Sequence, residues 1–244
     1  GSFMIRNSNL GYYVNDAATT GDVYCTNVGN EINTGRTPGS PKALLSEILD
    51  AYDLEPGDTV YVDTGMYALP GRFVFHQHDA GEGTNQVQVL GSTNEVAGGT
   101  QWVGTGALTL ESPRALLLQD VSLQITGTAQ TVGVLLNTSS NVTLRRIRVR
   151  GNGLTSGIEV RSSFGSMLDR CVVVGVNGSG LNDNASRGTL WQHGVLWSNV
   201  VAVKSQAGST NLSLRHSVLG AFSSSQTVYV VANGLQADYN SVWS

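Results

Sequence analysis

The segment Leu118-Gln119-Asp120-Val121-Ser122-Leu123 begins a pattern of inward apolar residues that returns five times in the second half of the chain. The later copies are Leu144–Val149, Leu168–Val173, Trp191–Leu196, Leu214–Leu219 and Ala237–Val242. Their last residues are 26, 24, 23, 23 and 23 positions apart, counted from Leu123. A repeat that settles at 23 residues has the length of one solenoid coil with three short strands and their turns. The copy at Trp191 fits least well, and Leu190 is its alternative inward residue.

Shorter apolar runs between the copies predict a further strand in several coils. They are Val132–Leu136, Gly157–Val160, Val200–Val203 and Val228–Val231. Side chains alternate between the two faces of a strand, and stacked strands lie about 4.8 Å apart. Residues at one position of the repeat should therefore form columns that run along the solenoid.

Upstream of the repeat, the sequence predicts one amphipathic helix that leads into a strand. Ser40 stands at the expected N-cap and Pro41 at the first helical position, where the missing N–H is tolerated. The apolar face consists of Leu44, Leu45, Ile48, Leu49 and Tyr52. The helix should end at the turn Glu55–Asp58, before a strand over Thr59–Asp63. Such a helix can cover the first open coil.

Three stretches of this region, Tyr12–Asp16, Gly35–Lys42 and Pro56–Val62, together resemble the N-terminal segment of pectin-lyase-like right-handed β-helix proteins from secreted bacterial polypeptides. The resemblance covers roughly residues 12–67 and implies a fold rather than an activity. With the repeat, it predicts an all-β fold: a single-stranded right-handed parallel β-helix of about 23 residues per coil with a short N-terminal capping helix. It also implies a bacterial protein that is secreted or held at the cell surface.

We expect one structural domain behind an irregular N-terminal segment. Residues 1–4 read as a cloning scar, residues 5–58 as the irregular segment with the capping helix, and residues 59–244 as the β-helix. The chain ends at Val242-Trp243-Ser244 inside a strand-like stretch, and an open coil exposes unpaired strand edges. The β-helix is therefore expected to be truncated here and to continue in the native protein, unless an end-to-end or oligomeric contact covers this coil.

The composition argues against two classes of partner. Only 13% of the residues are charged and the net charge is −4, so the chain lacks the basic stripe that displaces counterions from nucleic acid. No apolar run approaches the ~18 residues of a membrane-spanning helix. Cys25 and Cys171 form neither a CxxC motif nor a disulfide framework, and we expect two unpaired, buried thiols.

Two outward columns carry most of the polar candidates. One contains Gln119, Arg145, Asp169, Gln192, Arg215 and Asp238. The next contains Asp120, Arg146, Arg170, His193, His216 and Tyr239. Because neighbours in a column should lie one strand spacing apart, ion pairs are expected between Arg145 and Asp169 and between Arg215 and Asp238. Each such surface pair contributes about 0–1 kcal/mol.

The arginines of this region predict a surface for an acidic polysaccharide. Arg146 and Arg170 are neighbours in one column, and Arg148 points outward from the same coil as Arg146. A guanidinium group matches a carboxylate through two parallel hydrogen bonds. The alternative is a solvated face whose charges discourage lateral aggregation.

Two histidine pairs raise the question of metal binding or proton sharing. His193 and His216 are successive members of one column, with no third ligand evident beyond Asp169 or Asp183. The second pair, His76 and His78 with Asp79 beside them, also lacks a third spaced ligand. We therefore expect no metal site and no cofactor, and a calcium ion has no support in the sequence.

The tryptophans Trp102, Trp191, Trp197 and Trp243 are candidates for stacking on sugar rings, because an exposed indole packs against the face of a pyranose. Trp197 follows the inward Leu196 and should point outward. Trp243 lies two coils further along the same column, which also holds Arg150. Loops that cover these tryptophans are the alternative.

Catalysis has less support. Val203–Gln206 resembles the segment that carries the basic lysine of the chondroitinase-B and alginate-lyase family, and the resemblance would make Lys204 the base that removes a proton beside a uronate carboxylate. That family places an arginine about one coil later, whereas Phe222–Val228 contains none. The closely spaced aspartate pairs of β-helix polygalacturonases are absent as well.

We therefore predict a bacterial surface or secreted β-helix module that acts as a scaffold or binds an acidic polysaccharide. The expected binding face carries Arg146, Arg148, Arg170, His193, His216 and Trp197. A polysaccharide lyase or glycoside hydrolase that acts on an acidic glycan is the alternative.

Overall fold

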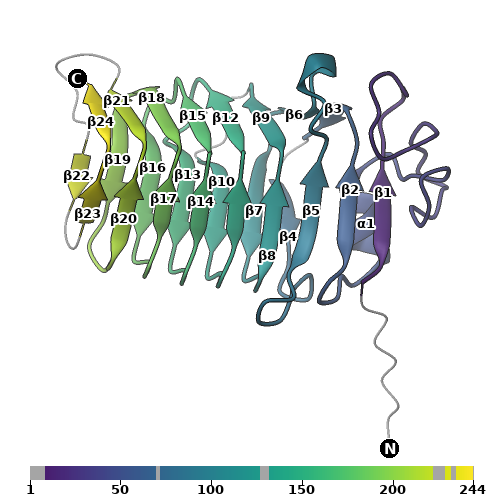
Figure 1. Cartoon of the computed structure of the whole chain (residues 1–244), viewed down its shortest axis with the longest axis horizontal. Coiled ribbons are helices and arrows are strands. Elements are labelled where there is room, and N and C mark those ends of the chain that lie inside the picture. The colour runs from purple at the N-terminus through teal and green to yellow at the C-terminus, as the bar shows by residue number, and fades with distance from the viewer. Residues whose placement is uncertain (1–8, 70–71, 127–131, 222–228, 232–234, 244) are drawn as a thin grey trace, which may run out of the picture.

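The computed structural model describes residues 9–69, 72–126, 132–221, 229–231 and 235–243. Three parallel β-sheets run along the molecule, and the chain passes through them in turn, once per coil (Figure 1). The helix α1 (Leu45–Ala51) lies at the N-terminal end of the stack, and a short 3-10 helix, η1 (Glu95–Ala97), lies in a loop between two strands. The fold is the right-handed parallel β-helix that the sequence predicts.

The strands fall into sheets that we call A, B and C. Sheet A contains β1 (Gly11–Val14), β2 (Thr59–Val62), β5 (Val87–Gly91), β8 (Leu116–Gln119), β11 (Thr143–Arg145), β14 (Met167–Asp169), β17 (Leu190–Gln192), β20 (Leu212–Arg215) and β23 (Leu235–Asp238). Sheet B contains β3 (Gly65–Ala68), β6 (Thr100–Gly104), β9 (Val121–Ile125), β12 (Arg148–Gly151), β15 (Val172–Val174), β18 (Val195–Asn199), β21 (Val218–Ala221) and β24 (Ser241–Trp243). Sheet C contains β4 (Arg72–Phe75), β7 (Ala107–Glu111), β10 (Val132–Asn137), β13 (Ser156–Arg161), β16 (Ser179–Asn184), β19 (Val201–Ser205) and β22 (Tyr229–Val231).

The strand register confirms the repeat. Leu123 pairs with Val149, and the in-step partners that follow are Val173, Leu196, Leu219 and Val242. The side chains from Leu123 to Leu219 in this column are at most 2% exposed, and burial of each contributes about 1.5–3 kcal/mol. Val242 holds the same inward position in the last coil and is 48% exposed.

The N-terminal coil is covered as expected, but by a shorter helix than the sequence predicts. α1 begins at Leu45 rather than at Pro41. The reason is that the backbone of Lys42 forms a parallel bridge to Val14 of β1, which holds the preceding residues in an extended path. Ile48 is fully buried in the core cluster, so the helix still closes the first coil.

Asp63 ties the irregular N-terminal segment to the first coil. Its buried carboxylate accepts hydrogen bonds from the backbone N–H groups of Val23 (2.7 Å), Tyr24 (2.7 Å), Cys25 (2.5 Å) and Thr64 (2.8 Å). Four charge-assisted bonds from backbone donors satisfy both oxygens of this carboxylate. Residues 23–25 are therefore fixed on the end of β2.

A buried polar cluster lies where sheet C passes to sheet A. Asp183 of β16 is fully buried, and Thr189 Oγ1 donates a hydrogen bond to its Oδ1 at 2.7 Å. Ser205 is the in-register neighbour of Asp183 in β19. Within the described residues, Asp183 Oδ2 and Ser205 Oγ have no hydrogen-bond partner. Burial raises the pKa of Asp183, so the fold favours its neutral form.

Both cysteines are unpaired and buried, as expected. Burial raises the pKa of the Cys171 thiol to about 12. A thiol of this kind stays protonated at neutral pH and is a poor nucleophile. The cysteines therefore serve packing rather than chemistry.

Candidate functional site

In each of the later coils, the short turn from sheet A to sheet B contains one residue with a left-handed backbone, and these residues form one outward column. They are Asp120, Arg146, Arg170, His193, His216 and Tyr239. Their φ values, between 49° and 59°, are left-handed. We call this column, together with the outward columns of sheet B that run from Ser122 to Ser241 and from Gln124 to Trp243, the A–B corner.

Arg146 and Arg148, two residues of the predicted binding face, are paired with carboxylates of the chain. Arg146 Nε and Nη2 donate to the two oxygens of Asp120 at 2.5 and 2.7 Å. The hydrogen bond to Asp120 raises the pKa of Arg146. Arg148 Nη2 donates to Glu95 Oε1 of η1 at 2.6 Å. Both positive charges are thus compensated within the fold.

Two other arginines of the corner are available as cations. Arg150 and Arg170 are exposed, and neither has an ion-pair partner in the part of the chain that the structure describes. Arg170 is the third arginine of the predicted face. The corner therefore keeps two arginines outside any ion pair of the described residues, Arg150 on the same strand as Arg148 and Arg170 in the next coil.

Asp169 links the two polar columns. Its Oδ2 lies 3.6 Å from Arg145 Nε, which confirms that predicted ion pair. Its Oδ1 lies 3.0 Å from His193 Nδ1 and accepts a hydrogen bond from Gln192 Nε2 at 3.2 Å. Burial tends to raise the pKa of Asp169, but the hydrogen bonds from His193 and Gln192 and the charge of Arg170 lower it overall. The carboxylate is therefore held ionised.

His193, His216 and Tyr239 form a continuous stack of rings. Successive ring centroids are 5.3 Å apart in both steps, with interplanar angles of 16° and 6°. Tyr239 is 85% exposed at the end of the stack. The described part of the chain contains no group of three histidine, cysteine or acidic side chains that could hold a metal ion. The stack presents an aromatic surface at the corner.

Trp197 and Trp243 extend this aromatic surface onto sheet B. They are 42% and 61% exposed, and Gly220 lies between them in the outward column. A Cβ at Gly220 would lie 2.5 Å from the six-membered ring of Trp197, so the indole rests over this glycine. In the other direction, the column continues through Val174 to Arg150.

Three expectations about this region are wrong. Trp102 and Trp191 are 3% and 0% exposed, because both occupy inward positions of their strands, and they cannot stack on a ligand. The structure thereby selects Trp191 over Leu190 as the inward residue. Arg215 Nε donates to Ser213 Oγ at 3.1 Å, and the described residues show no ion pair between Arg215 and Asp238.

Lys204 lies on sheet C, away from the A–B corner. It follows Asn182 and Glu159 along one outward column, in which both of these neighbours are buried, at 6% and 4% exposed. Arg161 Nε donates to Glu159 Oε1 at 2.8 Å, and Gln206 Nε2 donates to Asn182 Oδ1 at 2.9 Å. An amine, an amide and a guanidinium–carboxylate pair thus follow one another across three coils. Residues 222–228, where the related lyases suggest an arginine, lie outside the described residues.

His76 and His78 stack on one another at the N-terminal end, with ring centroids 5.5 Å apart. His78 Nε2 lies 4.0 Å from carboxylate oxygens of both Asp53 and Asp79. Asp79 Oδ2 also accepts a hydrogen bond from the His76 backbone N–H at 3.2 Å. The described residues hold no three-ligand metal group here either.

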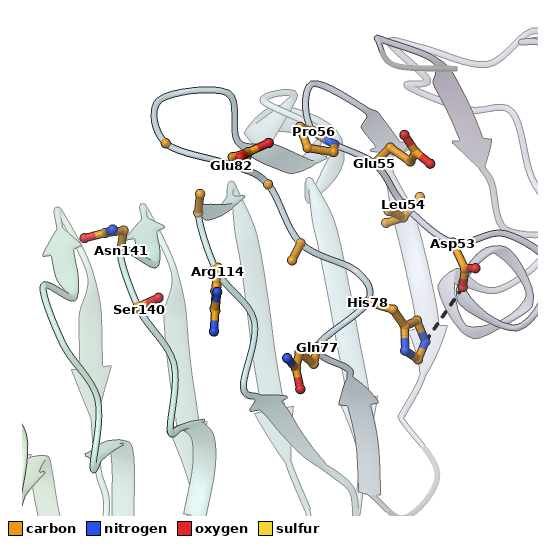
Figure 2. Close-up of a pocket in the computed structure, with 14 residues that line it drawn as sticks. Asp53, Leu54, Glu55, Pro56, Gln77, His78, Glu82, Arg114, Ser140 and Asn141 are labelled. Atoms are coloured by element: carbon orange, nitrogen blue, oxygen red, sulfur yellow. Dashed lines mark ion pairs between the residues drawn. The ribbon is translucent and has the colours of Figure 1, made fainter. Parts of the chain in front are cut away.

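A pocket of about 590 Å³ lies beside His78 (Figure 2). We call it the N-terminal pocket; it is lined by residues 53–56, 77–78, 80–83, 114–115 and 140–141. Figure 2 shows Arg114 between Gln77 on one side and Ser140 on the other. The sequence does not predict this site, because the pocket joins turns of different coils to a loop outside the repeat. One signal was present: residues 114, 140, 164, 187 and 210 follow the same spacing and form a column of bridges.

Comparison with known proteins relates the chain to others through its fold. No protein-family model matches the sequence, and no curated protein matches it. A rhamnogalacturonan lyase structure superposes with a TM-score of 0.65 and 14% identity, over 95% of this chain and 62% of that one. The pectate lyase Pel9A gives 0.57 and 12%, over 89% and 56%, and ORF18 of Geobacillus virus E2 gives 0.57 and 12%, over 75% and 40%.

The chain spans less than two thirds of the length of each of these structures. Among the described residues, no helix has the length and apolar character needed to cross a membrane. At these sequence identities the shared property is the architecture. The chain is a right-handed parallel β-helix, the fold that it shares with these structures.

Proposed function

We propose that this protein is a secreted or surface-attached bacterial β-helix module that binds an acidic polysaccharide along the A–B corner. The observation that carries the proposal is the outward column in which Arg150, Trp197 and Trp243 recur at every second coil. Two of the structures that share the fold are named as lyases of rhamnogalacturonan and pectate, which supports acidic polysaccharides as the ligand class.

The aromatic groups supply the apolar part of the surface. The exposed indoles of Trp197 and Trp243 can pack against the faces of sugar rings, and two strand spacings separate them by about 10 Å. The ring stack that ends at Tyr239 runs parallel to this column, and the outward column from Ser122 to Ser241 lies between them. A polysaccharide that follows the solenoid axis would contact both series of rings.

The free arginines supply the charge. Arg150 and Arg170 can bind ligand carboxylates without breaking an existing ion pair, whereas Arg146 and Arg148 would first have to leave Asp120 and Glu95. We therefore expect Arg150 and Arg170 to contribute more to affinity than Arg146 and Arg148. Since these contacts are exposed, binding should weaken as the salt concentration rises.

Removal of either exposed tryptophan is expected to weaken binding to polygalacturonate or rhamnogalacturonan. Trp197→Ala and Trp243→Ala should each raise Kd about tenfold or more, the effect of losing roughly 1.4 kcal/mol, as measured by affinity electrophoresis or calorimetry. Phe164→Ala is the matched control, because Phe164 is 55% exposed in a different turn column. Unfolding midpoints are needed for each variant, since Trp197 packs over Gly220. Unchanged affinity in both folded tryptophan variants would refute binding at this corner.

A second candidate function is β-elimination of an acidic polysaccharide, and the observation that favours it is the outward column of Lys204, Asn182 and Glu159 on sheet C. In that reaction a base removes the proton next to the uronate carboxylate, the glycosidic oxygen leaves, and an unsaturated sugar remains. Lys204, which is only partly buried, would be the base.

The two functions give different results with the same polysaccharides. For a binding module, we expect no ultraviolet absorbance from unsaturated uronate products during prolonged incubation. If product forms, is lost in Lys204→Ala and persists in Trp243→Ala, the lyase replaces the binding module as the better assignment. Lys42→Ala is a suitable control, because Lys42 lies in the N-terminal segment.

A further inference from the structure

The N-terminal pocket has the size of a small-molecule site and lies away from the A–B corner. Its volume of about 590 Å³ falls within the range of about 300–1,000 Å³ that is typical of ligand pockets. The loop around Gln77, the segment that follows α1, and the turns of Arg114 and Ser140 line it (Figure 2). The columns of the A–B corner suit the length of a polymer, whereas this open pocket has room for one sugar residue or a chain end.

Arg114 is the cation of the pocket. Among the described residues it has neither an ion-pair partner nor a side-chain hydrogen bond, although carboxylates line the same pocket. Its guanidinium group offers a planar pair of donors that matches a carboxylate. Gln77 on one side and Ser140 on the other present an amide and a hydroxyl group to a ligand held there.

The acidic side chains restrict which anions fit. Asp53, Glu55 and Glu82 also line the pocket, and Asp53 lies 4.0 Å from His78 Nε2. Carboxylates accept hydrogen bonds from sugar hydroxyls, but they repel a second negative charge. The lining is therefore complementary to a molecule with one carboxylate and several hydroxyl groups, and less so to a compact polyanion.

We infer that the N-terminal pocket binds a single uronate residue, free or at the end of an acidic chain, with its carboxylate on Arg114 and its hydroxyls on Gln77 and Ser140. The inference rests on the proposed function for the choice of an acidic sugar, but it concerns a separate site. Occupation of this site would let the module recognise a chain end while the A–B corner holds the chain interior.

The test is a titration of the folded protein with galacturonate, followed by NMR or calorimetry, with galactose and inorganic phosphate as comparison ligands. We expect galacturonate to bind at least tenfold more tightly than either. Arg114→Ala should weaken binding tenfold or more. Arg114→Lys should recover only part of it, since an ammonium group has no planar fork. Arg187→Ala should have no effect, because Arg187 is exposed in the same turn column but outside the pocket.

The outcomes separate this inference from the proposal for the corner. No galacturonate binding, or binding that survives in Arg114→Ala, overturns the assignment of the pocket. Phosphate binding as tight as galacturonate binding also overturns it, because the pocket would then be a general anion site. Trp243→Ala should leave the monosaccharide titration unchanged while it weakens polymer binding. Loss of only one of the two activities therefore identifies which site fails.

Discussion

Asp63→Ala is expected to lower the free energy of unfolding of the N-terminal region by about 3–5 kcal/mol, because it leaves four buried or half-buried backbone N–H groups without their charged acceptor. Residues 23–25 would then detach from the end of β2. Stability in a solenoid is approximately a sum of local and neighbour terms, so the loss should be greatest in the first coils.

Hydrogen exchange of the amides of Val23, Tyr24 and Cys25, together with the thermal midpoint, would check this prediction. Asp63→Asn should destabilise the N-terminal region nearly as much as Asp63→Ala, since the introduced amide nitrogen would face two of the backbone N–H donors. Asp53→Asn is the control: Asp53 is 82% exposed, and the change should alter stability by no more than about 0.5 kcal/mol. Protection of these three amides that is unchanged in Asp63→Ala would show that Asp63 does not anchor the segment.

Asp183→Asn is expected to stabilise the protein at neutral pH by about 1–3 kcal/mol, because a neutral amide replaces a carboxyl group that is costly to ionise in the core. The Oδ1 atom of the introduced asparagine can keep the hydrogen bond from Thr189, and its Nδ2 can donate to Ser205 Oγ, which has no partner among the described residues. The substitution therefore supplies a donor at every pH, whereas the wild-type side chain has one only when its carboxyl group is protonated.

The pH dependence has a definite sign. Because the pKa of Asp183 is raised in the fold, its contribution to stability is fully present below the unfolded pKa of about 3.9 and is lost as the pH rises through the folded pKa. The stability difference between Asp183→Asn and the wild type should therefore grow as the pH rises from about 4. Denaturant unfolding at a series of pH values measures this difference.

Asp169→Asn is the matched control, with the opposite sign. The pKa of Asp169 is lowered in the fold, so its contribution is present above the unfolded pKa and lost as the pH falls through the folded pKa. Its substitution should destabilise at neutral pH and become neutral in acid. Two results would contradict the interpretation of Asp183 as a buried acid. One is a stability difference between Asp183→Asn and the wild type that stays constant with pH. The other is a stability difference with the same sign as the one for Asp169→Asn.

The core and the columns could be predicted from the sequence because both follow from periodicity. The spacing from Leu123 to Leu219 specified the strand register, and the register brought Arg145 to Asp169 and His193 to His216. These features depend on equivalent positions in adjacent coils, which a repeat makes visible.

What the sequence could not provide depends on residues outside the repeat or on local backbone geometry. Glu95, which neutralises Arg148, lies 53 positions away in a loop with no counterpart in other coils. The left-handed positions of Arg146 and His193 are not occupied by glycine or asparagine, the residues that would indicate such a conformation in the sequence. The N-terminal pocket likewise joins Arg114 to the loop of Gln77, and no period relates the two.

The left-handed residues in the turns of the A–B corner lower the stability of the fold but provide outward side chains that can contact a ligand. A left-handed conformation costs a non-glycine residue roughly 1 kcal/mol or more, a cost that glycine would avoid. Asp120, Arg146, Arg170, His193, His216 and Tyr239 all accept this cost at one edge of the molecule. Glycine at these positions would remove the conformational cost in the folded solenoid. It would also remove the side chains that this edge presents to a ligand. These residues could also be substituted one coil at a time with other side chains, since the core beneath them does not depend on their identity.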